Sequence, residues 1–344
     1  MHTLDFEIAN LSDWLAEKTG ARGELVIEPI KGGASCEMFK MQRTVGAVSD
    51  QWIIRRAPVT AVSDTAHNVM REYKIIEALN GSDVPVPELL AASDDRAIMG
   101  APFFIMKYID GEVIRWGLPD DYLAHPETQV CIGEELIDKI AALHAFDWRN
   151  SAIAQLSHPE NYLQRQVERW MNQLAKYRSR DLPGVDAVAK WLDDNRPARG
   201  DLAVMHGDYK LDNVICSRLA PPRILSMLDF EMTTVGDPLI DLAWAMIFWP
   251  EEGNPIAFVT PGSNRGMTAE FCQTPVQLIQ RYADKTGRDL SQLQWYHAFS
   301  AWKLAIVLEG SYAKYLSGKS KNPNHQFMGP VIDTLLQRAQ RFAV

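Results

Sequence analysis

The sequence predicts an α/β protein of the α+β type with a bilobal arrangement, in which a small antiparallel sheet carrying one helix precedes a larger, mainly helical region. Short β-like segments separated by Gly-containing turns occupy the first hundred or so residues. Apolar residues at helical spacing dominate the chain after residue 111. The 344 residues, 47% of them hydrophobic, are enough for two lobes, which we place at residues 1–110 and 111–344.

The first region contains the predicted sheet. Its strands are expected at residues 24–30, 37–43, 51–56, 97–98 and 103–109. One helix, residues 66–80, interrupts them, because Val69, Tyr73 and Ile76 recur at the spacing of one buried helical face. Gly81 is a typical residue just after a helix, so the helix should end there.

The second region contains the predicted helices and two short strands. Helices are expected around Ile132 to Leu143 and at residues 162–177, 185–194, 293–316 and 327–342. The strands, residues 202–205 and 223–228, are each followed by a polar motif. Residues 250–275 are rich in Gly, Pro, Asn and Ser, which predicts a long loop.

The composition argues against several classes of function. A formal net charge of −9, without a long like-charge run, disfavours non-specific nucleic-acid binding, which depends on basic patches. The four cysteines are far apart and predict neither a zinc site nor a disulfide framework. Apolar stretches are too short to span a bilayer and the N-terminus has no secretory signal, so we expect a cytoplasmic protein without a membrane partner.

The segment at residues 206–213, His-Gly-Asp-Tyr-Lys-Leu-Asp-Asn, contains the side chains that phosphoryl transfer requires. This reaction needs a carboxylate that accepts the proton of the attacking hydroxyl, oxygen ligands for Mg²⁺, and cations near the phosphate oxygens. Because the segment leaves a predicted strand, it can direct several side chains toward one point. We therefore predict Asp208 as the catalytic base, Asn213 as a metal ligand and Lys210 as a catalytic phosphate contact.

A second metal ligand is predicted at Asp229. It directly follows the apolar run at residues 224–228, and a carboxylate after a buried strand is costly to desolvate unless it is exposed, paired or bound to a metal. Mg²⁺ prefers a few carboxylate or amide oxygens together with phosphate oxygens and waters. Asn213 and Asp229 together would supply the protein ligands of such a site.

These motifs resemble those of known phosphotransferases. The order His-x-Asp-x-Lys-x-x-Asn, an apolar strand and then Asp-Phe is similar to the catalytic and metal-binding motifs of protein kinases. Gly207 and the segment Gly-Asp-Pro-Leu-Ile-Asp-Leu-Ala at residues 236–243 resemble instead the aminoglycoside/choline phosphotransferase family. Within it, the chain is similar to the branch associated with acyl-CoA dehydrogenases in the segments at residues 32–35, 54–56, 71–73, 159–162 and 304–305. The resemblance implies a protein-kinase-like fold that uses Mg²⁺ and ATP, with GTP as an alternative donor.

The same resemblance assigns a nucleotide site. Gly32, Gly33 and Ser35 are similar to the loop that covers the nucleotide in these enzymes. The backbones of Lys107 and Ile109 would meet the adenine edge between the lobes.

A strand cation paired with a helix carboxylate is also implied, with one substitution. Glu72 matches the helix glutamate, whereas Arg55 occupies the strand position that holds Lys in protein kinases. A guanidinium can bind phosphate through two hydrogen bonds and still pair with a carboxylate. Strand alternation places Arg55 and Arg56 on opposite faces, and we predict that Arg55 faces the nucleotide.

Other polar residues near these motifs have structural explanations. His206 braces the loop in the resembled folds. Asp237 is an expected N-cap beside Pro238, and Asp241 is assigned a structural role as well. Asp212 is expected to be a solvated loop residue.

The resemblance implies a small-molecule hydroxyl as the phosphate acceptor. It favours a hydroxyacyl-CoA or another hydroxy-acid derivative, with an aminoglycoside or choline-type substrate as the alternative. The acceptor pocket should use residues 110–122, the 250–275 loop and the late helices, since loops carry specificity. Two other classes stay open: a non-catalytic nucleotide-binding regulatory module, and an acyltransferase or hydrolase, although no Gly-x-Ser-x-Gly motif is present. The sequence predicts no particular oligomeric state.

Overall fold

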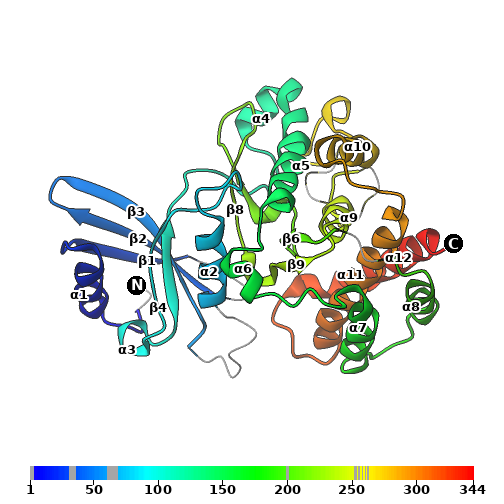
Figure 1. Ribbon diagram of the computed structural model, residues 1–344, viewed down its shortest axis with the longest axis horizontal. Coiled ribbons are helices and arrows are strands. Elements are labelled where there is room, and N and C mark those ends of the chain that lie inside the picture. The colour runs from blue at the N-terminus through cyan, green and yellow to red at the C-terminus, as the bar shows by residue number, and fades with distance from the viewer. Residues whose placement is uncertain are drawn as a thin grey trace.

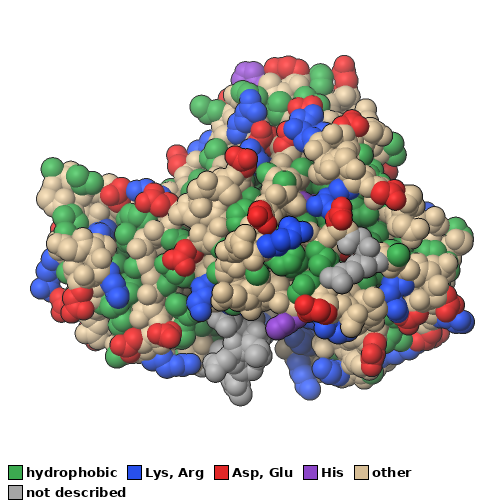
Figure 2. Space-filling view, viewed as in Figure 1, with side chains coloured by type: hydrophobic (Ala, Val, Ile, Leu, Met, Phe, Trp, Pro, Cys, Tyr) green, Lys and Arg blue, Asp and Glu red, His purple; other side chains and the backbone are tan. Residues whose placement is uncertain are grey.

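The computed structural model places a small sheet beside a larger helical part (Figure 1). It describes residues 4–30, 36–59, 69–198, 201–251, 254, 256–257, 259, 261 and 263–344. No helix in these ranges is both long and apolar enough to cross a membrane. On the face shown in Figure 2, positive and negative side chains are interspersed over both parts of the molecule.

Five antiparallel strands form the N-terminal sheet in the order β1-β2-β3-β5-β4. The strands are β1 (Glu24–Ile30), β2 (Glu37–Val45), β3 (Val48–Arg56), β4 (Leu89–Ser93) and β5 (Phe103–Lys107). The β2–β3 hairpin turns at Gly46, whose φ of 60° favours glycine. The predicted antiparallel sheet is therefore confirmed.

Each face of the sheet packs against a different set of helices. The outer face, which includes Ile54, packs against α1 (Ile8–Thr19) and α3 (Arg96–Met99). The inner face, which includes Ile53, packs against α2 (Val69–Leu79), and its core continues into the C-terminal part. Because alternate strand residues point to opposite faces, Arg55 lies on the inner face and Arg56 on the outer one.

The prediction of a strand at residues 97–98 is wrong. Residues 97–98 belong to helix α3, because the Asp95 side chain accepts a hydrogen bond from the backbone N–H of Ala97 and caps the helical turn. The strand that pairs with β5 at this edge is β4 instead. The sheet also carries α3 in addition to the helix predicted at residues 66–80, which is described from Val69 onward, and α1 precedes β1 in the chain.

The C-terminal part is mainly helical, as predicted. Its longest described helix, α11 (Leu293–Leu316), packs against α9 (Leu239–Ile247) and α12 (Met328–Phe342). The other described α-helices are α4 (Asp120–Ala124), α5 (Val130–Ala145), α6 (Ala152–Gln155), α7 (Gln166–Ala175), α8 (Val185–Asp194) and α10 (Pro275–Thr286). The division at residue 110 stays a prediction, since one apolar core runs across it.

Two small antiparallel sheets flank the polar motifs. β6 (Ala203–Met205) ends directly before His206 and pairs with β9 (Thr234–Gly236). β7 (Val214–Cys216) begins directly after Asn213 and pairs with β8 (Ile224–Met227), which ends two residues before Asp229. The pairing of β7 with β8 therefore brings Asp229 close to the polar segment at residues 206–213.

Substitution of Arg56 tests how much its buried polar contacts on the outer face of the sheet stabilise the protein. Its guanidinium lies 2.6 Å from Glu37, 2.7 Å from Asp5 and 2.7 Å from the carbonyl of Met99, beside two phenylalanine rings. Arg56→Leu should lower the free energy of unfolding by about 2–4 kcal/mol, because a buried carbonyl and two carboxylates lose their partner. Chemical denaturation measures the change.

A matched control exists on the surface. Arg22 pairs with Asp13 at 2.5 Å, but both side chains are more than half exposed. Arg22→Leu should therefore change the free energy of unfolding by less than about 0.5 kcal/mol. Equal effects of the two substitutions would show that burial of Arg56 is not what stabilises the sheet.

Candidate active site

The sheet and the helical part meet at a cavity of about 390 Å³. Arg55 and Glu72 line it from the sheet side, and Asn213 and Asp229 line it from the helical side. The remaining wall is largely apolar and includes Met38, Ile76, Met106 and Met227. Four of the predicted site residues thus share one cavity that has both charged and apolar walls.

The loop that carries Asp208 is held by a buried carboxylate. Asp241 on α9 accepts hydrogen bonds from the backbone N–H groups of His206 and Gly207, at 2.5 and 2.9 Å. Burial acts to raise the pKa of Asp241, but hydrogen bonds from His144 and the backbone outweigh it and hold the pKa below its usual value. Asp241 therefore stays ionised and has the structural role predicted for it.

His206 and Gly207 shape the turn before Asp208. Nε2 of His206 donates to the carbonyl of Leu228 at 2.8 Å, and Nδ1 accepts from the backbone N–H of Asp208 at 3.3 Å; these partners assign the tautomer. Gly207 has a φ of +88°, and a Cβ there would lie 2.7 Å from the carbonyl oxygen of Met232. His206 therefore braces the loop, and position 207 requires glycine.

Three donors surround the carboxylate of Asp208. Lys210 Nζ lies 2.5 Å and Asn213 Nδ2 lies 2.9 Å from Oδ2. The indole N–H of Trp244 donates to Oδ1 at 2.8 Å. The side chain still keeps 29% of its surface exposed. A carboxylate that is fixed by donors and open on one side can accept a proton from a hydroxyl group.

The chemistry of Asn213 and Asp229 fits a Mg²⁺ site. The Asn213 side chain donates to Asp208 through Nδ2, which leaves its amide oxygen for another partner. The backbone N–H of Leu228 donates to the Asn213 carbonyl at 2.9 Å and so ties the two ligand positions together. Within the described ranges, no three His, Cys, Asp or Glu side chains form a metal site of their own. One carboxylate and one amide oxygen suit an ion whose other ligands are phosphate oxygens and waters.

Asp229 has a backbone conformation that few non-glycine residues adopt. Its φ of 66° and ψ of 60° lie in the left-handed region. This conformation is strained, and strained residues cluster at functional sites. The conformation therefore agrees with a functional role for the Asp229 carboxylate.

Arg55 connects the two sides of the cavity. Its guanidinium lies 2.7 Å from Glu72 on α2 and 2.9 Å from Asp229. Burial opposes the charge of Arg55, but the surrounding carboxylates outweigh it and raise its pKa. Burial also raises the pKa of Glu72 to about 7, against the effect of Arg55. The expected pairing of Arg55 with Glu72 is present, while contact with a nucleotide stays a prediction.

The structure describes only some of the other residues that are predicted to contact the nucleotide. Gly32, Gly33 and Ser35 lie outside the described residues. Lys107 ends β5, and its backbone N–H donates to a neighbouring carbonyl at 2.7 Å. Neither Lys107 nor Ile109 is among the described residues that line the 390 Å³ cavity. Their contact with an adenine edge stays a prediction.

Asp212 is not the solvated loop residue that the sequence predicts. Its side chain is only 16% exposed and lies 3.5 Å from Lys210 and 3.9 Å from Arg115. Burial raises the pKa of Asp212, against the effect of Lys210. Lys210 therefore lies between Asp208 and Asp212, which hold its ammonium beside the predicted base.

Two further residues near Asp208 were not predicted from the sequence to belong to the site. Trp244 follows Asp241 by three positions and so shares its face of α9, a spacing that could have identified it. Lys303 is a single cation within the apolar segment at residues 301–307 of α11, which is the sequence signal of a buried charge. Its ammonium lies 4.2 Å from the ring centroid of Trp244 and 5.4 Å from that of Trp170.

The Lys303 side chain is 9% exposed. Burial lowers the pKa of Lys303 to about 8, although Asp208 and Asp241 act in the opposite direction. No carboxylate lies within ion-pair distance of it among the residues that the structure describes. Lys303 is thus a buried cation whose contacts are aromatic rings.

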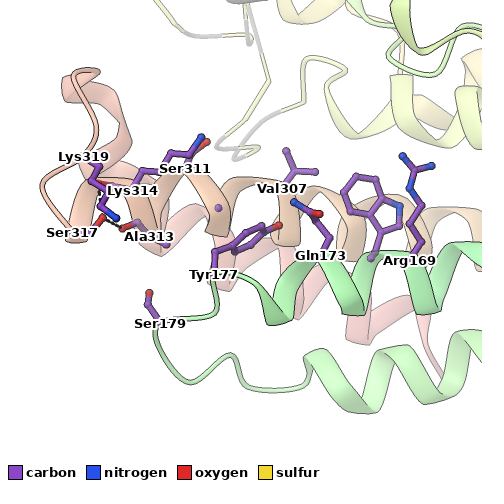
Figure 3. A pocket seen from close by; sticks show the side chains of 12 residues that line it. Arg169, Gln173, Tyr177, Ser179, Val307, Ser311, Ala313, Lys314, Ser317 and Lys319 are labelled. Carbon is purple, nitrogen blue, oxygen red and sulfur yellow. Dashed lines mark hydrogen bonds between the residues drawn. The ribbon is translucent and has the colours of Figure 1, made fainter. Parts of the chain in front are cut away.

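A second cavity of about 860 Å³ lies between α7 and α11. Figure 3 shows Val307 and Gln173 along its length, Arg169 at one end, and Lys314 and Lys319 at the other. These three cations line it, and no carboxylate does so within the described part of the chain.

The 860 Å³ cavity is connected to the catalytic loop by side chains. Trp170 lines the cavity and contacts Lys303, which contacts Trp244, the donor to Asp208. Of the described late helices only α11 lines this cavity, together with α7, and no described residue of 110–122 or 250–275 does so. Residues 112–114 and 117–121 line a separate cavity of about 380 Å³.

Comparison with known proteins identifies what this arrangement is similar to. Residues 26–260 match the model of the phosphotransferase enzyme family. A crystal structure from Ralstonia eutropha, provisionally named an aminoglycoside phosphotransferase, has 26% identity and a TM-score of 0.83, with 98% of each chain covered. A choline kinase from Cryptosporidium parvum has 14% identity and a TM-score of 0.57, covering 92% of this chain and 89% of its own. The predicted kinase-like fold is confirmed.

Curated relatives include "Acyl-CoA dehydrogenase family member 11" of chicken, Gallus gallus, which is 30% identical over 335 residues. The match covers 93% of this chain but only 41% of the relative. "Acyl-CoA dehydrogenase family member 10" of mouse, Mus musculus, is 26% identical, with 85% and 27% covered. The chain therefore spans less than half the length of these relatives, and the predicted likeness to the branch associated with acyl-CoA dehydrogenases is confirmed.

The burial of Lys303 predicts a specific pH dependence of stability. The pKa of about 8 in the folded chain is below the value of about 10.4 expected for an unfolded chain. Between these values the unfolded state binds more protons, so the free energy of unfolding should rise as the pH increases from 8 to 10. Lys303→Met removes this contribution. At pH 7 the variant should be more stable than the parent by roughly 1–3 kcal/mol, and at pH 10 the difference should nearly vanish.

Denaturation curves at both pH values check this expectation. Lys190 on α8 serves as the control, because its side chain is 77% exposed and pairs with Asp194. Lys190→Met should show no such difference between pH 7 and pH 10. A pH-independent effect of Lys303→Met would mean that burial does not lower the pKa of Lys303 in the folded chain.

Proposed function

Because the chain belongs to the phosphotransferase enzyme family, we propose that it transfers the γ-phosphoryl group of ATP, with Mg²⁺, to a hydroxyl group of a small molecule. The observation that carries the proposal is the position of Asp208. Its carboxylate is fixed by Lys210, Asn213 and Trp244. Asn213 lines the 390 Å³ cavity, and Trp244 is connected to the 860 Å³ cavity through the contacts of Lys303 with Trp244 and Trp170. A base in this position can serve a donor on one side and an acceptor on the other.

Each residue then has a defined role. Asp208 orients the acceptor hydroxyl and takes its proton, while Lys210 faces the transferred phosphoryl group. Asn213 and Asp229 hold the metal ion, which neutralises charge on the phosphate oxygens when bound. Arg55, kept in place by Glu72, supplies a planar cation for the donor phosphates.

The apolar wall of the 390 Å³ cavity suits a purine ring. Met106 lies in β5, one position before Lys107, so a ring bound there would lie near the segment from which Lys107 and Ile109 would contact the adenine edge. The covering loop would include Gly32, Gly33 and Ser35. GTP is the alternative donor.

For the acceptor we propose a hydroxyacyl-CoA or another hydroxy-acid derivative. The 860 Å³ cavity presents Arg169, Lys314 and Lys319, which suit an acceptor with negative groups. An aminoglycoside or choline-type substrate is cationic and would meet like charge in this cavity. The relatives named as acyl-CoA dehydrogenase family members point the same way.

The competing function is a non-catalytic nucleotide-binding regulatory module. The presence of Asp208 together with Asn213 and Asp229 favours catalysis, because a module that only binds nucleotide has no need of a base beside the metal ligands. Isothermal titration with ATP and Mg²⁺ separates the two functions when it is combined with an acceptor screen. Nucleotide binding without phosphorylation of any acceptor would support the regulatory module.

The role of Asp208 is tested by Asp208→Asn. Mass spectrometry of reactions with hydroxy acids, their CoA thioesters, choline and aminoglycosides should detect a phosphorylated product for the parent chain. The variant should lose about 10²–10⁴-fold in turnover, because the amide cannot take up the proton. Its affinity for ATP with Mg²⁺ should change less than about threefold. Parent-like turnover in Asp208→Asn would rule out this residue as the base.

The role of Asp229 is tested by Asp229→Ala. The substitution removes a carboxylate from the predicted metal site, so titration should show at least about tenfold weaker binding of ATP with Mg²⁺. Binding of ATP without Mg²⁺ should be affected less. Glu160→Ala, an exposed substitution beside a different cavity, is the control. An unaltered Mg²⁺ dependence in Asp229→Ala would exclude this carboxylate as a ligand.

A further inference from the structure

We propose that Lys303 is the residue that recognises the acceptor, and that its ammonium binds a carboxylate or carbonyl oxygen close to the hydroxyl that is phosphorylated. The proposal rests on the proposed function and adds to it the residue that recognises the acceptor. It also predicts how the site rejects cationic molecules.

Lys303 precedes the part of α11 that lines the 860 Å³ cavity, and it contacts the lining residue Trp170 without being a lining residue itself. Val307, Gly310, Ser311 and Lys314 line this cavity, and they follow Lys303 by 4, 7, 8 and 11 positions. Residues at these spacings share one face of an α-helix. Lys303 therefore continues the lining face by one turn, in the direction of the catalytic loop.

Two tryptophans define the surroundings of the ammonium. Trp170 on α7 belongs to the wall of the cavity, with its ring centroid 5.4 Å from Lys303 Nζ. Trp244 on α9 lies closer, with its centroid at 4.2 Å, and its N–H donates to Asp208. An acceptor oxygen bound by Lys303 would therefore lie one indole ring away from the catalytic carboxylate.

The N–H groups of the Lys303 ammonium are available as hydrogen-bond donors to a ligand. Aromatic faces stabilise the positive charge but take up none of its three N–H groups in a conventional hydrogen bond. No hydrogen bond of Lys303 to another described residue is present. An oxygen of a bound molecule can thus complete the coordination of the ammonium at a place where water has limited access.

Two other buried charges among the described residues are paired within the chain. Glu309, six positions along α11 from Lys303 and fully buried, is bound by Arg180 at 3.1 Å. Arg56 in the sheet has two carboxylates of its own. A buried charge without such a partner is costly to fold, and groups of this kind are typical of functional sites. The contrast with Glu309 and Arg56 indicates that the partner of Lys303 is a ligand.

The recognition chemistry follows from this geometry. A carboxylate or a thioester carbonyl next to the hydroxyl gains a charge-assisted hydrogen bond. A quaternary or protonated amine at the same place meets a cation and is repelled. Lys303 would therefore select hydroxy acids and their thioesters over choline and aminoglycosides.

The test compares Lys303→Met and Lys303→Arg with the parent chain, using 3-hydroxybutyrate, its coenzyme A thioester and 1,3-butanediol. The first two carry the oxygen that Lys303 would bind, and the diol lacks it. Lys303→Met should raise the KM for the oxygen-bearing acceptor at least about tenfold, with little change for the diol or for ATP. Lys303→Arg should restore part of the loss. Lys190→Met should match the parent.

Binding is measured separately from turnover, so that failure of the proposed function is recognised as such. Trp170 and Trp244 flank the ammonium, so acceptor binding should change the intrinsic tryptophan fluorescence of the parent chain but not of Lys303→Met. Binding that depends on Lys303 without any phosphorylated product would disprove transfer to these acceptors and leave the recognition intact. The recognition itself is disproved if neither oxygen-bearing probe binds the parent, or if both chains bind it equally. An equal fall in kcat for the diol and the acid would also disprove it, because Lys303 would then act through Asp208.

Discussion

The site depends on one buried carboxylate. Asp241 accepts the backbone N–H groups of His206 and Gly207 and so determines the direction in which the chain leaves β6. His144 lies beside Asp241. The His144 side chain is fully buried and is hydrogen-bonded to the hydroxyl of Tyr282 at 2.7 Å. Every later group in the loop takes its place from this turn. An ionised side chain in the core is costly, and here the cost is offset by backbone donors that would otherwise be unpaired.

The helical part of the protein uses the same principle in several places. Asp237 accepts hydrogen bonds from the backbone N–H of Leu239 and the hydroxyl of Tyr296, at 3.1 and 2.5 Å. Together with Asp241 it fixes the first turn of α9, the helix that also carries Trp244. Helix position, loop shape and the orientation of Asp208 are therefore coupled through short polar contacts in an otherwise apolar core.

Much of the fold and of the candidate site can be predicted from the sequence, because many of the sequence patterns that indicate them lie within one short segment of the chain. Helix spacing identifies α8 and α11 with the bounds that the structure has, and the loop at residues 206–213 is contiguous in the chain. The strand expected at residues 97–98 failed because one side-chain cap from Asp95 outweighed a weak apolar signal. The contact of Lys303 with two tryptophans joins α7, α9 and α11, and depends on helix packing that no spacing along one segment encodes. The 860 Å³ cavity has the same origin.

The guanidinium of Arg55 joins Glu72, from the sheet part, to Asp229, from the helical part. A single planar group with several donors thus spans the cleft, where an ammonium would offer one point charge. The two described walls of the 390 Å³ cavity are consequently joined by the protein itself. In the proposed function, little of the binding free energy of the nucleotide would be spent on bringing these two walls together.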